Sequence, residues 1–159
     1  MNSLVLDASA ILAIINQEAG AEQLTPELLA NAICSMVNLA EVQAKLVSRG
    51  WSPDVAWEDA TSPIREAVPF LEEHAKIAGS LVALTRQLGL SLGDRACLAL
   101  GIALKAPVFT AEKTWSKLKL GVRVHASAEI VGRFSPLSDL GASMARRVVT
   151  QYRLRRTED

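Results

Sequence analysis

The chain has 159 residues, half of them apolar, and its 17 basic and 17 acidic side chains give a formal net charge of zero. This composition excludes a disordered chain and suits one compact domain. No stretch reaches the ~20 uninterrupted apolar residues of a membrane-spanning helix, and Asp7 interrupts the first apolar run without a basic segment before it. We therefore expect a cytoplasmic protein without a signal peptide. Cys34 and Cys97 lie in separate apolar segments, which predicts buried thiols and not a disulfide or a zinc site.

The neutral sum hides an uneven charge distribution. Residues 1–132 carry 11 Lys and Arg against 14 Asp and Glu, a balance of −3, whereas residues 133–159 carry six Arg against three acids, a balance of +3. We expect residues 1–132 to form the folded domain and residues 133–159 to form a basic extension. Apolar residues at every fourth position predict a helix in this extension, at Leu140, Met144, Val148 and Tyr152.

The first half of the chain alternates between short apolar runs and helical patterns. We predict strands at residues 4–6 and 32–34, and helices at residues 8–15, 20–29, 36–49 and from 53 onward. Ser35 can cap the helix that ends before Gly50, and Pro53 suits the first turn of the next helix.

The second half continues the alternation. We predict an extended piece at 68–70, strands at 107–110 and 122–124, and helices at 72–88, 92–104 and 114–118. Pro69 indicates a sheet edge, and Ser91 stands three residues before Asp94 in the pattern of a capping box. Strands that alternate with helices indicate an α/β fold with a parallel sheet and helices on both faces.

Four carboxylates lie at the ends of predicted strands or on the helices that follow them. Asp7 ends the first strand, and Glu41 lies roughly two turns into the helix after the second. Asp94 lies in the first turn of a helix, and Glu112 follows the strand at 107–110. Because the working groups of open α/β sheets gather beyond the carboxyl ends of the strands, we expect the four acids to converge at one edge.

Such a cluster of like charges needs a cation to relieve its repulsion, unless some of the acids are protonated. Oxygen ligands favour Mg²⁺ or Mn²⁺ over Zn²⁺, and such a site predicts a metal-activated water that attacks a phosphodiester. Each acid also has a plain structural interpretation. Asp7 can cap a helix, Asp94 can be favoured by a helix dipole, and Glu41 and Glu112 can be solvated. The spacing alone leaves both interpretations open.

Four strings around these acids resemble the signature segments of PIN domains, and more narrowly those of the VapC toxins of bacterial type II toxin–antitoxin modules. They are VLDASA at 5–10, NLAEV at 38–42, SLGDRACLAL at 91–100 and FTAEKTW at 109–115. The four strings occur in the right order, and the resemblance extends from about Leu4 to Val124.

The resemblance implies a PIN-like three-layer α/β/α sandwich with a short, mostly parallel central sheet. It implies an endoribonuclease that depends on Mg²⁺ or Mn²⁺, a homodimer, and a cognate antitoxin whose C-terminal segment covers the active-site groove. The catalytic and metal-binding acids that it implies are Asp7, Glu41, Asp94 and Glu112, with Ser9 and Thr110 in support through hydrogen bonds.

The fourth acid departs from the pattern of the family. These toxins usually have Asp in a Thr-Ala-Asp string, whereas this chain has Glu112. The added methylene can move a ligand by roughly an ångström, and an error of that size can cost about 10²-fold in rate. We expect activity to persist, with an effect on metal preference.

Residues beside the acids are weaker candidates. Arg95, Lys113 and Lys117 can contact RNA phosphates, although a solvated position is the commoner one for each. Trp115 is expected to pack under the short helix, with stacking on a base as the alternative. Neither histidine receives a catalytic role.

Several other function classes lack their motifs. Ser9 stands where an aspartyl-phosphate phosphatase would need a second Asp, the first strand has no acidic pair of a phospho-receiver, and no P-loop or zinc-protease string is present. Two alternatives stay open: a housekeeping PIN nuclease without an antitoxin, and a catalytically weakened PIN-like module that binds RNA or protein.

Overall fold

The computed structural model describes residues 3–126, so the predicted helix within residues 133–159 lies outside them. Within residues 3–126 one sheet has the strand order β3-β2-β1-β4-β5, and each neighbouring pair is parallel. Its five strands are β1 (Leu4–Leu6), β2 (Ala32–Ser35), β3 (Glu66–Val68), β4 (Val108–Thr110) and β5 (Val124–Ala126). The carboxyl ends of these strands therefore lie at one edge of the sheet.

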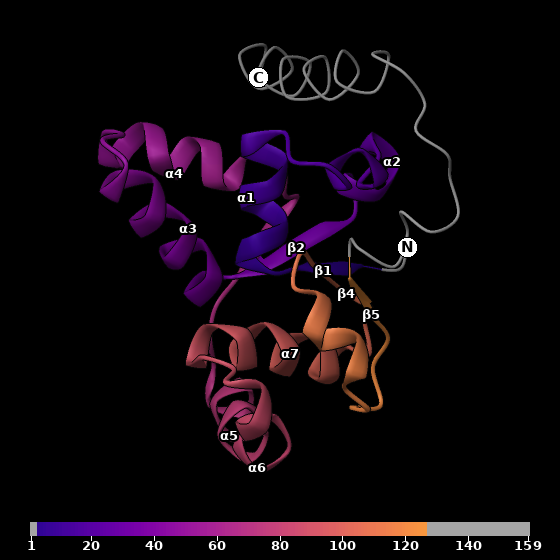
Figure 1. Cartoon of the computed structure of the whole chain (residues 1–159). Helices are drawn as coiled ribbons and strands as arrows, with labels where there is room; N and C mark the ends of the chain where they lie inside the picture. The colour runs from indigo at the N-terminus through magenta and orange to yellow at the C-terminus, as the bar shows by residue number, and fades with distance from the viewer. Residues whose placement is uncertain (1–2, 127–159) are drawn as a thin grey trace.

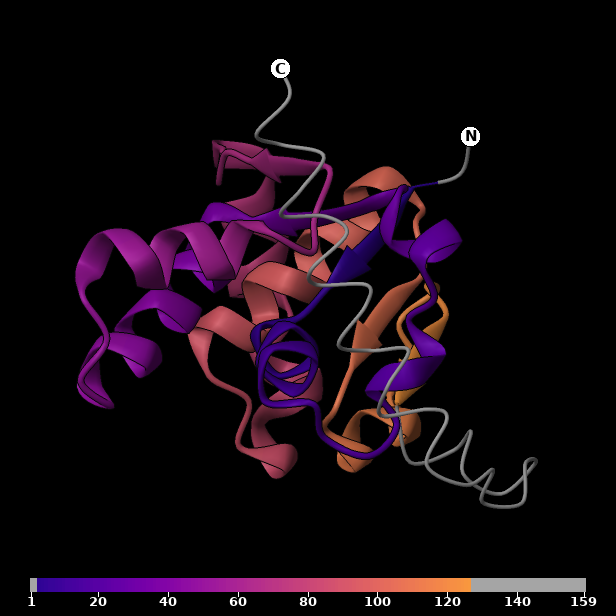
Figure 2. The same ribbon diagram turned by 90° about the horizontal axis from the view of Figure 1, so that it is seen from above.

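Helices cover both faces of the sheet (Figure 1). One layer contains α1 (Ala8–Asn16), α2 (Pro26–Leu29), α3 (Met36–Ser48) and α4 (Pro53–Thr61). The other contains α5 (Glu72–Ser80), α6 (Val82–Thr85) and α7 (Leu92–Leu104). Figure 2 shows the layers from above, with α1 nearly end-on in front of the strands. The predicted three-layer α/β/α sandwich is confirmed, and the sheet within residues 3–126 is parallel throughout.

Alternate residues of the central strands supply two apolar cores. Leu4 and Leu6 pack in the core under α1 and α3, whereas Val5 packs in the core under α7. This arrangement explains why β1 is apolar at every position, since a parallel strand between two helical layers has no solvent face. Cys34 and Cys97 are buried free thiols, one in each core, and burial raises the pKa of both.

The helix α7 lies very close to β4 at Gly101. A Cβ atom at this position would overlap the Cγ2 methyl of Val108 and lie 3.2 Å from the carbonyl oxygen of Ala106. Glycine in a helix interior costs about 1 kcal/mol relative to alanine, and here it permits the close approach of helix and strand.

Two helices that were predicted as continuous are interrupted in the structure. Residues 20–29 form the 3₁₀ helix η1 (Ala21–Gln23) and then α2, because the Thr25 hydroxyl accepts a hydrogen bond from the Leu28 amide and starts a new helix at Pro26. Residues 72–88 form α5, α6 and the 3₁₀ helix η2 (Arg86–Leu88). Here the buried Thr85 hydroxyl donates to the Leu81 carbonyl, a contact that bends helices.

The last described strand starts two residues later than predicted. Val108 pairs with Val124, and the His125 ring stacks on Phe109 with centroids 4.6 Å apart. The preceding short helix is the 3₁₀ helix η3 (Lys113–Lys117). None of the helices in residues 3–126 has the length and apolar character needed to cross a bilayer.

Candidate active site at the carboxyl edge of the sheet

Asp7 is the best-held acid at this edge. It follows β1 as the N-cap of α1, and only 2% of the residue is exposed. Its Oδ2 accepts hydrogen bonds from the hydroxyls of Ser9 at 2.6 Å and Thr110 at 3.2 Å, and its Oδ1 accepts one from Asn38 Nδ2 at 3.3 Å. Both carboxylate oxygens are therefore fixed by side chains from three different elements.

The environment of Asp7 makes its ionisation unfavourable. Its pKa is raised from 3.8 to about 6. Burial is the main cause, the hydrogen bonds from Ser9 act in the opposite direction, and the charge of Asp94 acts in the same direction as burial. Desolvation dominates because the carboxylate loses most of its contact with water. The effect of Asp94 also indicates that the two carboxylates belong to one electrostatic neighbourhood.

Ser9 and Thr110 join α1 to the turn after β4. Their hydroxyl oxygens lie 3.1 Å apart, and both contact Asp7. The Ala111 amide donates to Ser9 Oγ at 2.9 Å, and the Glu112 amide donates to Thr110 Oγ1 at 3.0 Å. The backbone that carries Glu112 is thus tied directly to the hydroxyls that hold Asp7.

Asn38 is a central residue of the site that the sequence analysis does not assign. It is fully buried in the first turn of α3, and its Nδ2 donates to Asp7 Oδ1 and, at 3.1 Å, to the Gly93 carbonyl. Its Oδ1 is buried without a hydrogen-bond partner among the described residues. The available signal was a polar residue on the otherwise apolar buried face of α3, one turn before Glu41.

Glu41 lies against the first turn of α7. Its Oε2 is 2.7 Å from the point that a Cβ of Gly93 would occupy, so the missing side chain makes room for the carboxylate. Its Oε1 forms an ion pair of 2.8 Å with Lys45 in the next turn of α3. The side chains of Glu41 and Lys45 are 31% and 47% exposed, so this ion pair is open to solvent.

Asp94 forms the predicted capping box of α7. It accepts from the Ser91 amide at 2.6 Å, and its own amide donates to Ser91 Oγ at 3.1 Å. The next residue, Arg95, donates from its guanidinium to the Leu90 carbonyl at 2.8 Å, so part of its hydrogen-bonding capacity serves the backbone. The plain structural role of Asp94 and its place at the acidic edge therefore coexist.

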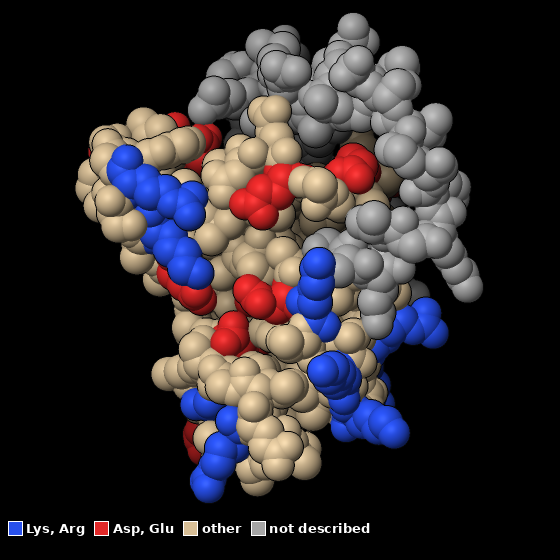
Figure 3. All heavy atoms as spheres, in the orientation of Figure 1, with Lys and Arg blue, Asp and Glu red and all other residues tan. Residues whose placement is uncertain are grey.

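Glu112 is the most exposed of the four acids and stands at the start of η3. Lys113 and Lys117 are exposed on the same short helix. Trp115 is 1% exposed and packs in the core under α7, as predicted. Figure 3 shows Asp and Glu side chains gathered across the middle of this face, with Lys and Arg side chains on both flanks.

The described residues do not present a ready-made metal site. Within residues 3–126, no three acidic, histidine or cysteine side chains are arranged to hold one ion. Glu41 is turned to Lys45 and Asp94 to the Ser91 amide, so each would have to exchange its partner for an ion. The donor set nevertheless suits a hard divalent cation, because it consists of carboxylates together with the unpartnered amide oxygen of Asn38.

The comparisons with known proteins agree with this fold. The chain is 21% identical to a chain of the structure of VapBC2 from Rickettsia felis bound to a DNA fragment from their promoter, with a TM-score of 0.60 and coverage of 77% of this chain and 97% of that one. For FitAcB from Neisseria gonorrhoeae the identity is 17%, the TM-score 0.61 and the coverage 79% and 98%. For VapBC-1 from nontypeable Haemophilus influenzae the identity is 16% and the TM-score 0.59, with coverage of 79% of this chain and 98% of that one.

At these identities the structural likeness shows the fold alone, and no curated protein matches the chain in sequence. The family model of the PIN domain, however, matches residues 4–120, which include all four acids and most of the chain. The chain therefore belongs to the PIN domain family.

Proposed function

We propose that the chain is a Mg²⁺- or Mn²⁺-dependent endoribonuclease and the toxin of a toxin–antitoxin pair. The observation that carries the proposal is the side chain of Asn38. It bridges the Asp7 carboxylate and the carbonyl of Gly93, the residue before Asp94, and it lies one turn before Glu41 on α3. Acids from three separate elements thereby share one edge of the sheet. Membership in the PIN family supports the same chemistry.

In this proposal Asp7, Glu41, Asp94 and Glu112 hold the ion. When bound, it activates a water and neutralises charge on the phosphate. Ser9, Thr110 and Asn38 keep the Asp7 carboxylate oriented. Lys113 and Lys117 are the proposed contacts to RNA phosphates, and Arg95 is a weaker candidate because the Leu90 carbonyl already engages it.

The toxin assignment rests on the structural neighbours, which are VapBC and FitAB toxin–antitoxin complexes. It implies an antitoxin that covers the acidic edge and a homodimer of this chain. We expect a small neighbouring reading frame that encodes a DNA-binding protein. Its product should abolish RNA cleavage when the two proteins are co-purified. Cleavage without any such inhibitor would favour the housekeeping nuclease.

The enzymatic part of the proposal is tested by RNA cleavage with Mn²⁺, with and without a chelator. We expect Asp94→Asn to lower cleavage by about 10²- to 10³-fold, since one acid of the site is neutralised. Asp54→Asn is the matched control, because Asp54 also lies in the first turn of a helix but on α4. Equal losses of cleavage in both variants would exclude the proposed site. So would the failure to find any RNA that the wild type cuts and Asp94→Asn leaves intact.

Metal binding is tested separately by isothermal titration. Mg²⁺ or Mn²⁺ should bind the full chain and bind Asp7→Asn much more weakly. Unchanged binding would place the metal site elsewhere on the chain.

A further inference from the structure

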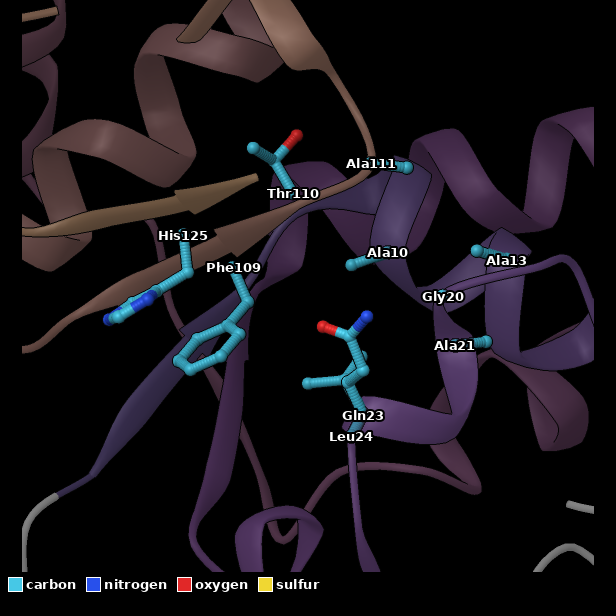
Figure 4. Close-up of a pocket in the computed structure, with 10 residues that line it drawn as sticks. All are labelled: Ala10, Ala13, Gly20, Ala21, Gln23, Leu24, Phe109, Thr110, Ala111 and His125. Atoms are coloured by element: carbon cyan, nitrogen blue, oxygen red, sulfur yellow. The ribbon is translucent and has the colours of Figure 1, made fainter. Parts of the chain in front are cut away.

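A mostly apolar pocket adjoins the acidic edge on the α1 side. Alanine and leucine side chains of α1, η1 and the segment after η1 face Phe109 and His125 across it (Figure 4). Figure 4 also shows the Gln23 amide between these two walls. Its Oε1 is buried and has no hydrogen-bond partner among the described residues. The pocket therefore offers apolar surface and one acceptor that lacks a donor.

Two acidic residues flank the η1 wall of this pocket, and the carboxylate of one of them, Glu22, accepts a hydrogen bond from the Gly20 amide at 2.8 Å. The exposed side chains of Glu18 and Glu22 stand on the two sides of Gly20 and Ala21, which line the pocket. Residues 1–44 contain five acids, and the first basic residue of the chain is Lys45. An occupant with apolar groups and a positive charge would match this wall.

The chain itself continues from the opposite wall. The last described residue, Ala126, pairs with Thr110, which lines the pocket together with His125. Because paired strands lie about 4.8 Å apart, the described part of the chain ends beside the pocket. The sequence that follows contains Ile130, Val131 and Phe134, with Arg133 among them.

The comparisons with known proteins leave part of this chain unmatched. The family model ends at residue 120, and the structural neighbours are covered to 97–98% by only 77–79% of this chain. About a fifth of this chain therefore has no counterpart in them.

We propose that the pocket is the docking site of this chain's own residues 127–137. Ile130, Val131 and Phe134 would cover the apolar surface, and Arg133 would face Glu22. A short tether gives an effective concentration of about 1 mM, so even a weak contact in the same chain is well populated. A backbone or arginine N–H of this segment would supply the donor that Gln23 Oε1 lacks. Docking would also hold the basic end of the chain beside the acidic edge.

Photo-crosslinking in the full chain tests this proposal. A benzophenone amino acid replaces Leu24 in the pocket, and in a control it replaces Leu84, which is 65% exposed on α6. We expect intramolecular crosslinks from position 24 to residues 127–137 and none from position 84. Crosslinks to a second copy, to another segment or to nothing in residues 127–137 would overturn the proposal.

Substitutions sharpen the assignment. Phe134→Ala should lower the crosslink yield by about tenfold, whereas Leu154→Ala should leave it unchanged. Glu22→Lys should lower the yield by about two- to fivefold, and Arg133→Glu should restore it in the double variant. An equal yield in all variants would contradict the docking. The crosslinks are measured without RNA or metal, so their outcome does not depend on the ribonuclease activity.

Discussion

The inner and outer acids of the carboxyl edge are held in different ways. Asp7 is buried, and both of its oxygens accept hydrogen bonds from neighbouring side chains. Glu41 and Asp94 are partly exposed and bind an exposed lysine and a backbone amide, and Glu112 is exposed on η3. The fold surrounds the inner acid with buried partners, whereas the outer three are open to solvent to a larger extent. In the proposed site, an ion would therefore meet one ligand that is already oriented and three that must exchange a partner or solvent for it.

The largest expected difference concerns the stability of the metal-free protein. The pKa of Asp7 is about 6 in the folded chain and 3.8 when unperturbed. The Asp7 carboxyl therefore ionises at a lower pH in the unfolded chain than in the folded chain. The free energy of unfolding consequently falls as pH rises from about 4 to about 6. Asp7→Asn should raise the free energy of unfolding by about 2 kcal/mol at neutral pH, and the gain should shrink toward ~pH 3.5. Urea unfolding with a chelator measures this, and a pH-independent effect would contradict the account.

The outer side is probed by Gly93→Ala. A Cβ at this position would displace the Glu41 carboxylate, which is the flexible end of a side chain. The fold should tolerate or gain from the change, by up to about 1 kcal/mol, because alanine suits a helix better. Metal affinity should fall by about tenfold or more. Calorimetry of unfolding and of Mn²⁺ binding separates the two effects, and a loss of both together would mean that the helix had moved.

A smaller effect is expected at Glu112. Because its side chain is exposed, Glu112→Gln should lower RNA cleavage by about fivefold, roughly 1 kcal/mol, and Glu112→Asp should retain activity. The exposed Glu27 of α2 supplies the control, as Glu27→Gln should change nothing. A loss of cleavage in Glu112→Gln as large as that in Asp94→Asn would contradict this minor role of Glu112.

The smallest effect should come from the partner of Glu41. Lys45→Ala removes an exposed ion pair, so the free energy of unfolding should change by less than about 0.5 kcal/mol. Mn²⁺ affinity should rise by about twofold, because Glu41 is released. Lys76 forms the same kind of pair with Glu72 on α5, at 2.6 Å, and Lys76→Ala is the matched control. Equal metal binding in the two variants would show that Lys45 does not compete for Glu41.

The parts of the fold that were predictable carry local signals. Ser35 and Ser91 cap the helices that follow them, and Pro53 lies in the first turn of α4, as their positions predict. The continuity of residues 20–29 and 72–88 was not predictable, because it depends on where single hydroxyls such as those of Thr25 and Thr85 find partners. The shift of β5 likewise depends on its register with β4.

The candidate site shows the same limit. Strand ends and motifs locate its acids, yet the role of Asn38 needs three segments to be brought together, since its amide touches Asp7 and Gly93 at once. The sequence also does not reveal that Arg95 turns to the Leu90 carbonyl. Such contacts are properties of packing, and no spacing in a single sequence encodes them.

The glycine at position 101 has a consequence for this geometry. It lies two turns after Asp94 in α7, and it faces the strand that leads to Glu112. The separation of these two acids is therefore set partly by a hydrogen atom in the interior, where a methyl group would push helix and strand apart. The spacing of two acids at this edge thus depends in part on a buried glycine of the helix interior.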